Sequence, residues 1–247
     1  MIWERKVDKL AVRRFASRDA MAAAAANDVA AELRLRLSQA AGARMIFAAA
    51  PSQAEMLAHL CRAEGIDWPR VTAFHMDEYV GLALDAPQRF AAWLEAHLFR
   101  RLAFGAVHRL APDAPDAYAA LLATAPIDIV CLGIGVNGHI AFNDPPVADF
   151  ADPRDAKRVV LDDICRQQQV DDQSFATLAD VPTEAVTLTV PRLLRADRLF
   201  CVVPGRLKRA AVRATLHGPI ATACPASILR THPDCILYLD PESDPDA

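Results

Sequence analysis

The sequence predicts an α/β fold: a doubly wound, mostly parallel, Rossmann-like sheet with helices on both faces. Short apolar, β-branched runs alternate along the chain with longer segments whose apolar residues recur at helical spacing. The run 127–132 is apolar at almost every position, as in a parallel strand that helices cover on both sides. A glycine-containing loop follows this run, at the strand end where open α/β sheets bind ligands.

Each predicted element has its own local signal. Ser17 is a helix N-cap, and an alanine-rich helix runs from there to Gly42, with apolar residues at Ala22, Ala26, Val29, Leu33 and Leu37. The predicted strands are 45–50, 71–74, 127–132, 186–190, 199–203 and 235–239. The predicted helices between them are 52–64, 88–102, 114–122, 191–195 and 206–216.

Residues 146–183 interrupt this alternation with a polar, irregular stretch that is rich in aspartate and contains Gln167, Gln168 and Gln169. A long insertion in a compact domain is more often a functional lid than a passive loop, so we expect a lid here. The tail after Pro241 is expected to fray. The length of 247 residues fits one domain spanning 1–247.

Composition excludes several classes of protein. The chain is 53% hydrophobic and 23% charged, has no apolar run of the ~18 residues that a membrane span needs, and begins with a charged segment instead of a signal peptide. We therefore expect a cytoplasmic protein. The net charge of −4 argues against a nucleic-acid binder. The six cysteines form no C-x-x-C pair, which favours buried free thiols over disulfides or a metal site.

Gly133, Gly135 and Gly138 spell G-x-G-x-x-G, the pattern of a dinucleotide-binding loop. That pattern needs a helix opening at its third glycine, and the prolines at 145 and 146 follow too soon for a long one. We therefore expect no dinucleotide cofactor.

Two segments carry a resemblance to a known family. Residues 74–82 read FHMDEYVGL and residues 137–143 read NGHIAFN. They resemble the M-D-E-Y-V-G-L segment and the D-G-H-I-A-F-N loop of the glucosamine-6-phosphate deaminase/isomerase family, whose wider relatives include 6-phosphogluconolactonases. The resemblance runs from about residue 44 to 240, in the same order along the chain.

The resemblance implies a cofactor-free, metal-free isomerase of amino-sugar metabolism that converts glucosamine 6-phosphate and water to fructose 6-phosphate and ammonium. Its partner would be a phosphorylated amino sugar, and a homo-oligomer is compatible with it. The alternatives are a 6-phosphogluconolactonase and a non-catalytic sugar-phosphate sensor. The sensor is disfavoured because the segment before residue 44 has no room for a helix-turn-helix. The sequence leaves open which amino sugar is used, the oligomeric state and any allosteric control.

Asp77 on its own fits a solvated strand end, and His139 fits a buried core histidine. The resemblance implies that Asp77 moves a proton from C2 to C1 of the opened sugar, with Glu78 structural, and that His139 opens the ring. Two helpers of the histidine differ from the family pattern: the aspartate is Asn137 and the glutamate is Asp144. We expect the Asn137 oxygen to accept a hydrogen bond from the imidazole, and Asp144 to lie closer or act through water.

The resemblance places the substrate phosphate at the end of the first predicted strand and near two cations. Ser52 and Gln53 open a helix there, where free N–H groups favour an anion, and Ser52 also fits a capping box with Glu55. Arg166 and Lys208 match the cations that the family uses for the phosphate. Gly135 and Gly138 shape the substrate loop.

Overall fold

The computed structural model describes residues 1–247 and has an eight-stranded main sheet. In order across the sheet, its strands are β1 (Trp3–Val7), β2 (Leu10–Arg14), β11 (Cys235–Leu239), β10 (Arg198–Val203), β7 (Ile129–Leu132), β3 (Ala43–Phe47), β4 (Val71–His75) and β6 (Ala106–His108). All neighbouring pairs are parallel except the antiparallel hairpin of β1 and β2. The predicted mostly parallel fold is confirmed.

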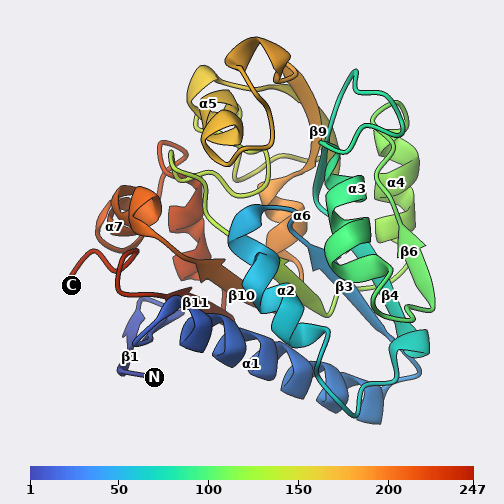
Figure 1. The fold of residues 1–247 in the computed structure, drawn as a ribbon. Helices are drawn as coiled ribbons and strands as arrows, with labels where there is room; N and C mark the ends of the chain where they lie inside the picture. Colours follow the sequence, from blue (N-terminus) through green and yellow to red (C-terminus); the bar gives the residue numbers. More distant parts are fainter.

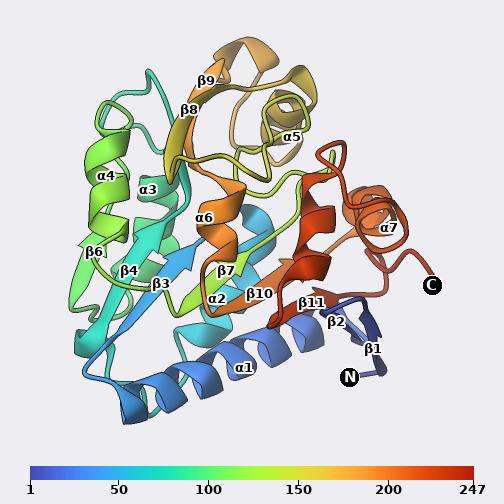
Figure 2. The same ribbon diagram turned by 180° about the vertical axis from the view of Figure 1, so that it is seen from behind.

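Helices cover both faces of this sheet. One face carries α1 (Arg18–Gln39), α2 (Ala54–Leu60) and α3 (Phe90–Leu94), which continues as a π-helical turn, Glu95–Phe99. The other carries α4 (Pro115–Leu122), α6 (Val190–Leu194) and α7 (Arg209–His217). In Figure 1, α2 and α3 lie in front of the sheet. In Figure 2, which shows the opposite face, α6 lies in front of it.

Alternation along the strands supplies both layers of the core. In β7, Ile129 and Cys131 pack with the α1 side, whereas Val130 and Leu132 pack with the α6 side. All four are buried, which explains why the strand has no polar position. The N-cap of α1 is Ser17, whose hydroxyl accepts the N–H of Ala20 at 3.2 Å, as predicted.

A second, antiparallel sheet stands above the carboxyl ends of the main strands. Its order is β5 (Asp77–Tyr79), β9 (Glu184–Leu188) and β8 (Ala156–Val160), and the helix α5 (Asp163–Asp171) lies beside it (Figures 1 and 2). The predicted strand at 186–190 therefore lies outside the main sheet. The prediction that 146–183 is irregular is wrong, because β9 supplies a partner for β8 and Asp162 caps α5 through the N–H of Cys165.

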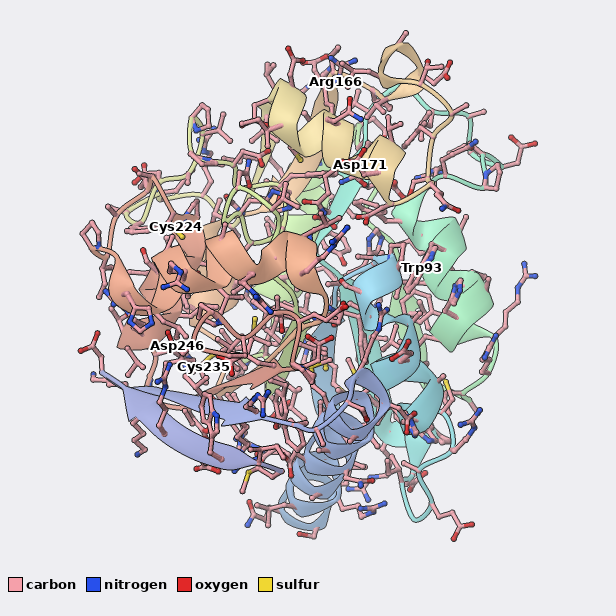
Figure 3. All side chains as sticks on the ribbon, turned by 60° about the vertical axis from the view of Figure 1, so that its left-hand side comes forward. Trp93, Arg166, Asp171, Cys224, Cys235 and Asp246 are labelled. Carbon is pink, nitrogen blue, oxygen red and sulfur yellow. The ribbon has the colours of Figure 1, made fainter.

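The C-terminal tail does not fray as predicted. Asp244 is buried and its carboxylate lies 3.1 Å from Nε of Arg14, while the Asp240 carboxylate accepts the N–H of Ser243 at 2.8 Å. Figure 3 shows Asp246 beside the β1–β2 hairpin, where it pairs with Arg5. The hairpin, β6 and the short 3-10 helices were not predicted; the latter are Pro51–Gln53, Trp68–Arg70, Leu178–Asp180, Arg206–Lys208 and Pro225–Thr231.

None of the helices combines the length and the apolar character that crossing a membrane would require.

Candidate active site

A pocket lies where the order of the strands reverses. The chain adds β4 and β6 on one side of β3, returns as β7 on its other side, and then adds β10 and β11. Loops leaving the carboxyl ends of β3, β4, β7 and β10 therefore diverge around one crevice, as Rossmann-like sheets require. The pocket lining includes Ser52, Gln53, Asp77, Gly135, His139, Gln168, Gln169, Asp172 and Lys208.

Asp77 lies at the start of β5 and is only 6% exposed. Burial is the main reason why the pKa of its carboxyl lies well above the ordinary value, and the negative charges of Glu78 and Asp144 raise it further. A carboxyl with a raised pKa holds a proton more firmly than an exposed aspartate. Asp77 can therefore take a proton from carbon and keep it long enough to return it.

His75 fixes the backbone beneath Asp77, a role that no pattern in the sequence indicated. Its Nδ1 donates to the carbonyl of Asp77 at 2.9 Å, and its Nε2 accepts the N–H of Leu110 at 2.8 Å. Burial lowers the pKa of His75 to about 4, so the ring is neutral and keeps both bonds. The contacts of Glu78 are structural, as expected. Its carboxylate accepts the N–H groups of Phe90 and Ala91 at the start of α3.

His139 and Asp144 are in direct contact. Nδ1 of His139 lies 2.8 Å from Oδ1 of Asp144, so the shorter side chain has come close instead of acting through water. Burial alone would raise the pKa of Asp144, but the hydrogen bond and charge of His139 and the amide of Asn137 outweigh it and lower the pKa. Asp144 is thereby held as a carboxylate beside the imidazole.

Asn137 does not contact the imidazole, so this part of the prediction is wrong. Its carbonyl oxygen accepts the backbone N–H of His139 at 3.1 Å, and its amide donates to Asp144 at 2.9 Å. The reason is local: an asparagine readily bonds the backbone two residues ahead, which closes a turn. Asn137 therefore positions Asp144 and the loop, and Asp144 alone faces Nδ1.

Two glycines of this loop are needed for different reasons. A Cβ on Gly135 would lie 2.2–2.4 Å from three atoms of the His139 ring, so only glycine leaves room for the imidazole. Gly138 has φ of +85°, and a Cβ there would lie 2.7 Å from Sγ of Cys224. Gly135 lines the pocket as predicted, whereas Gly138 shapes the turn from behind it.

Lys208, Ser52 and Gln53 meet at another part of the pocket lining. Burial lowers the pKa of Lys208, and the nearby charge of Asp172 opposes that shift. Gln53 is held by its Nε2, which donates to the carbonyl of Val202 at 3.0 Å. The predicted capping box of Ser52 is wrong, because Ser52 lies inside a 3-10 turn whose N-cap is Ala50. Ser52 instead lines the pocket.

Arg166 does not lie at the pocket, so the predicted convergence of Arg166 and Lys208 is not found. Its guanidinium donates to the carbonyls of Leu178 and Val181 at 2.7 and 3.1 Å, within the lid. Figure 3 shows Arg166 at the upper, outer part of α5. The phase of the helix is the physical reason, since the pocket-lining residues are one face of α5 and Arg166 is on another.

The residues of the segment 146–183 that do line the pocket were missed. Gln168 accepts the N–H of Val136 at 2.9 Å, and Gln169 accepts the hydroxyl of Tyr79 at 2.7 Å. Asp172 follows one turn later. Together with Cys165 they have the spacing i, i+3, i+4 and i+7 of one helix face, which was a usable signal within the polar run.

A family profile described as glucosamine-6-phosphate isomerases/6-phosphogluconolactonase matches residues 16–237. The chain belongs to this glucosamine-6-phosphate isomerase/6-phosphogluconolactonase family. The match includes Asp77, His139 and Lys208, so the pocket lies within the family's own domain.

Relatives within this family include a glucosamine-6-phosphate deaminase of Exiguobacterium sibiricum, 37% identical over 188 residues, which are 74% of this chain and 73% of that protein. A glucosamine-6-phosphate deaminase of Listeria innocua is 35% identical over 72% of this chain and 76% of its own length. Among solved structures, a monomeric glucosamine-6-phosphate deaminase superposes with a TM-score of 0.84 at 25% identity, covering 94% of this chain and 98% of its own. The 6-phosphogluconolactonase of Thermotoga maritima, covering 94% and 100%, has a TM-score of 0.76 at 17% identity and shows the fold alone.

Proposed function

We propose that this protein is a glucosamine-6-phosphate deaminase, which converts glucosamine 6-phosphate and water to fructose 6-phosphate and ammonium. The observation that carries the proposal is the pairing of a buried carboxyl, Asp77, with the His139–Asp144 pair in one pocket that also contains Lys208. This arrangement supplies two proton carriers and one cation to a single bound molecule. The reaction needs no redox cofactor, because hydrogen moves only between neighbouring carbons of the substrate.

Ring opening is assigned to His139. Asp144 engages Nδ1 of the imidazole, which leaves Nε2 as the nitrogen that exchanges a proton with the substrate. His139 delivers a proton to O5 and removes one from O1, so the ring C1–O5 bond breaks and an open-chain aldehyde forms. Asp144 stabilises the positive ring while it holds the extra proton.

Proton transfer between carbons is assigned to Asp77. The carboxylate removes the C2 proton and returns it to C1, while O1 gains the proton that the 2-ammonium group loses, which leaves a hydroxymethyl group at C1 and a C=N bond at C2. Water adds to C2, ammonia leaves, and a ketone remains, so atoms and electrons balance. The raised pKa of Asp77 suits this role, because the group must hold the proton between the two transfers.

The phosphate is assigned to Lys208, with the hydroxyl of Ser52 and the buried Gln53 beside it. Arg166 has no part in this assignment, because its guanidinium is bound to lid carbonyls. The lid residues Gln168 and Gln169 supply further polar contacts above the sugar.

The direct test measures ammonium and ketose formation by the wild-type protein on a panel of amino-sugar 6-phosphates, with 6-phosphogluconolactone as control. We expect equal amounts of ammonium and fructose 6-phosphate from glucosamine 6-phosphate, with solvent deuterium at C1 only to the extent that the proton held by Asp77 exchanges with solvent before its return. Asp77→Asn should lose at least ~100-fold in kcat, the usual contribution of a general base. Lys208→Met should mainly raise KM. Lactone hydrolysis without ammonium release from any amino sugar would overturn the proposal in favour of a lactonase.

A further inference from the structure

Three potential metal ligands converge behind the imidazole. Nδ1 of His139, a carboxylate oxygen of Asp144 and Sγ of Cys165 all lie within 4.8 Å of one another, and all three residues are buried. His139 and Asp144 come from the loop after β7, whereas Cys165 comes from the first turn of α5. The lid and the catalytic loop therefore meet at this cluster.

The cluster contains polar atoms whose bonding is incomplete. Oδ2 of Asp144 is buried without an aligned hydrogen-bond partner, and Nδ1 of His139 has only the short contact of 2.8 Å with Oδ1 of Asp144. Buried polar atoms of this kind are uncommon, because each one costs desolvation free energy. The surroundings are also acidic: the one ion pair of Asp144 is with His139, and no lysine or arginine forms an ion pair with Asp77 or Asp162.

We propose that His139, Asp144 and Cys165 form a zinc site whose occupation inhibits the enzyme. Zn²⁺ binds imidazole nitrogen, carboxylate oxygen and thiolate sulfur at about 2.0–2.3 Å in tetrahedral geometry, which separates the ligand atoms by roughly 3.3–3.8 Å. The observed spread reaches this geometry through a shift of about 1 Å in the side chains. Three protein ligands leave the fourth position for water. Mg²⁺ is a poor occupant, because it prefers oxygen ligands alone.

Occupation would block turnover in two ways. The metal would take Nδ1 and a carboxylate oxygen, which would remove the His139–Asp144 pair that the proposed function uses for ring opening. It would also tie α5 to the loop after β7 and hold the lid closed. Metal binding itself does not depend on the proposed reaction, whereas inhibition rests on it.

Binding is tested on chelator-treated protein with Co²⁺ as a spectroscopic probe and Zn²⁺ in calorimetry. We expect one ion per chain and a sulfur-to-cobalt charge-transfer band, which Zn²⁺ abolishes by displacement. Cys165→Ser should lose the band and weaken Zn²⁺ binding at least ~10-fold. The matched control is Cys61→Ser, because Cys61 is a half-buried thiol at the end of α2 whose hydrogen bond goes to the carbonyl of His97, outside the pocket.

Inhibition is measured for each variant relative to its own metal-free rate. Zn²⁺ should inhibit the wild type and Cys61→Ser alike, Cys165→Ser at least ~10-fold less, and Mg²⁺ should have no effect. The absence of a charge-transfer band in wild type, or its persistence in Cys165→Ser, would refute the site. A band that depends on Cys165 in a protein without deaminase activity would support the metal site and reject only the proposed reaction.

Discussion

At the scale of single residues, the site contains acidic side chains that are buried from solvent. Asp77 and Asp144 are both almost fully buried, yet their pKa values shift in opposite directions. Asp144 has His139 and Asn137 as partners that stabilise its charge, whereas no ion pair compensates the burial of Asp77. The pKa of one carboxyl is thus lowered beside the imidazole and that of the other is raised, as the proposed division of roles between them requires.

The raised pKa of Asp77 has a consequence for stability. The folded protein binds its proton more tightly than the unfolded chain, so the folding free energy loses a contribution as pH rises from about 3.9 through the raised pKa. Asp77→Asn has no carboxyl to ionise. We expect it to unfold at a higher temperature than wild type at neutral pH, with the difference shrinking toward acidic pH. Thermal unfolding across this range checks the sign, and an equal difference at every pH would contradict it.

Gly135 can be tested by the smallest possible change. In Gly135→Ala the new methyl would lie 2.2–2.4 Å from the His139 ring, so the imidazole must move. We expect kcat to fall about 100-fold, the cost of misplacing a catalytic group by ~1 Å. Gly81→Ala is the control, since Gly81 has φ of +90° and open space around it. The control should lose stability through backbone strain and keep its kcat, and similar kcat values in both variants would argue against this account.

At the scale of elements, the lid helix α5 divides its faces between the pocket and its own support. Gln168 and Gln169 reach the loop after β7 and Tyr79, while Arg166 bonds the carbonyls of Leu178 and Val181. Arg166 therefore stabilises the lid from outside, and a substrate anion would have to displace these bonds to reach it.

Arg166→Gln should loosen the lid more than it affects phosphate binding. Loss of the charged donor leaves two carbonyls without their partner and costs about 1.5 kcal/mol or more, which predicts about tenfold faster amide exchange across residues 163–181. KM should rise less than in Lys208→Met. The control is Arg158→Gln, which removes an exposed ion pair with Glu184 and should change little. A KM increase in Arg166→Gln as large as that of Lys208→Met would restore Arg166 to the phosphate site.

At the scale of the whole molecule, two cores share one sheet. The α1 side and the α6 side each contain alternate residues of the same strands, and Tyr79 and Phe142 join the lid to the first of them. The C-terminal tail is tied to the β1–β2 hairpin through the pair of Arg14 and Asp244. Because neither core survives without the strands, we expect residues 1–247 to unfold as one unit.

This expectation is checked by comparing unfolding transitions that report on different parts of the chain. Far-ultraviolet circular dichroism follows all elements, whereas tryptophan fluorescence follows Trp3, Trp68 and Trp93, which lie in or near the hairpin, β4 and α3. The two transitions should coincide in denaturant. An earlier transition in only one of the two signals would show that the chain unfolds as separate units.

The sequence alone determined five strands of the main sheet, β3, β4, β7, β10 and β11, most of the helices between them, and the strand ends at which the pocket lies. Buried strands, caps and glycine turns are signalled by neighbouring residues, so β7, α1 and the loop at Gly135 could be predicted. Asp77, His139 and Lys208 could be assigned to one pocket because the carboxyl ends of parallel strands meet at one edge of a sheet. Their roles in catalysis stay predictions.

Only the tertiary structure decided which long-range partners each side chain has. The phase of α5 turned Arg166 away from the pocket, and a turn directed the Asn137 carbonyl to the backbone instead of the imidazole. Pairing between distant segments made the small sheet from β5, β8 and β9. Cys165 reached His139 and Asp144 in the same way: helical spacing indicates which face of α5 it shares with Gln168 and Gln169, but the loop that this face meets depends on how the elements pack.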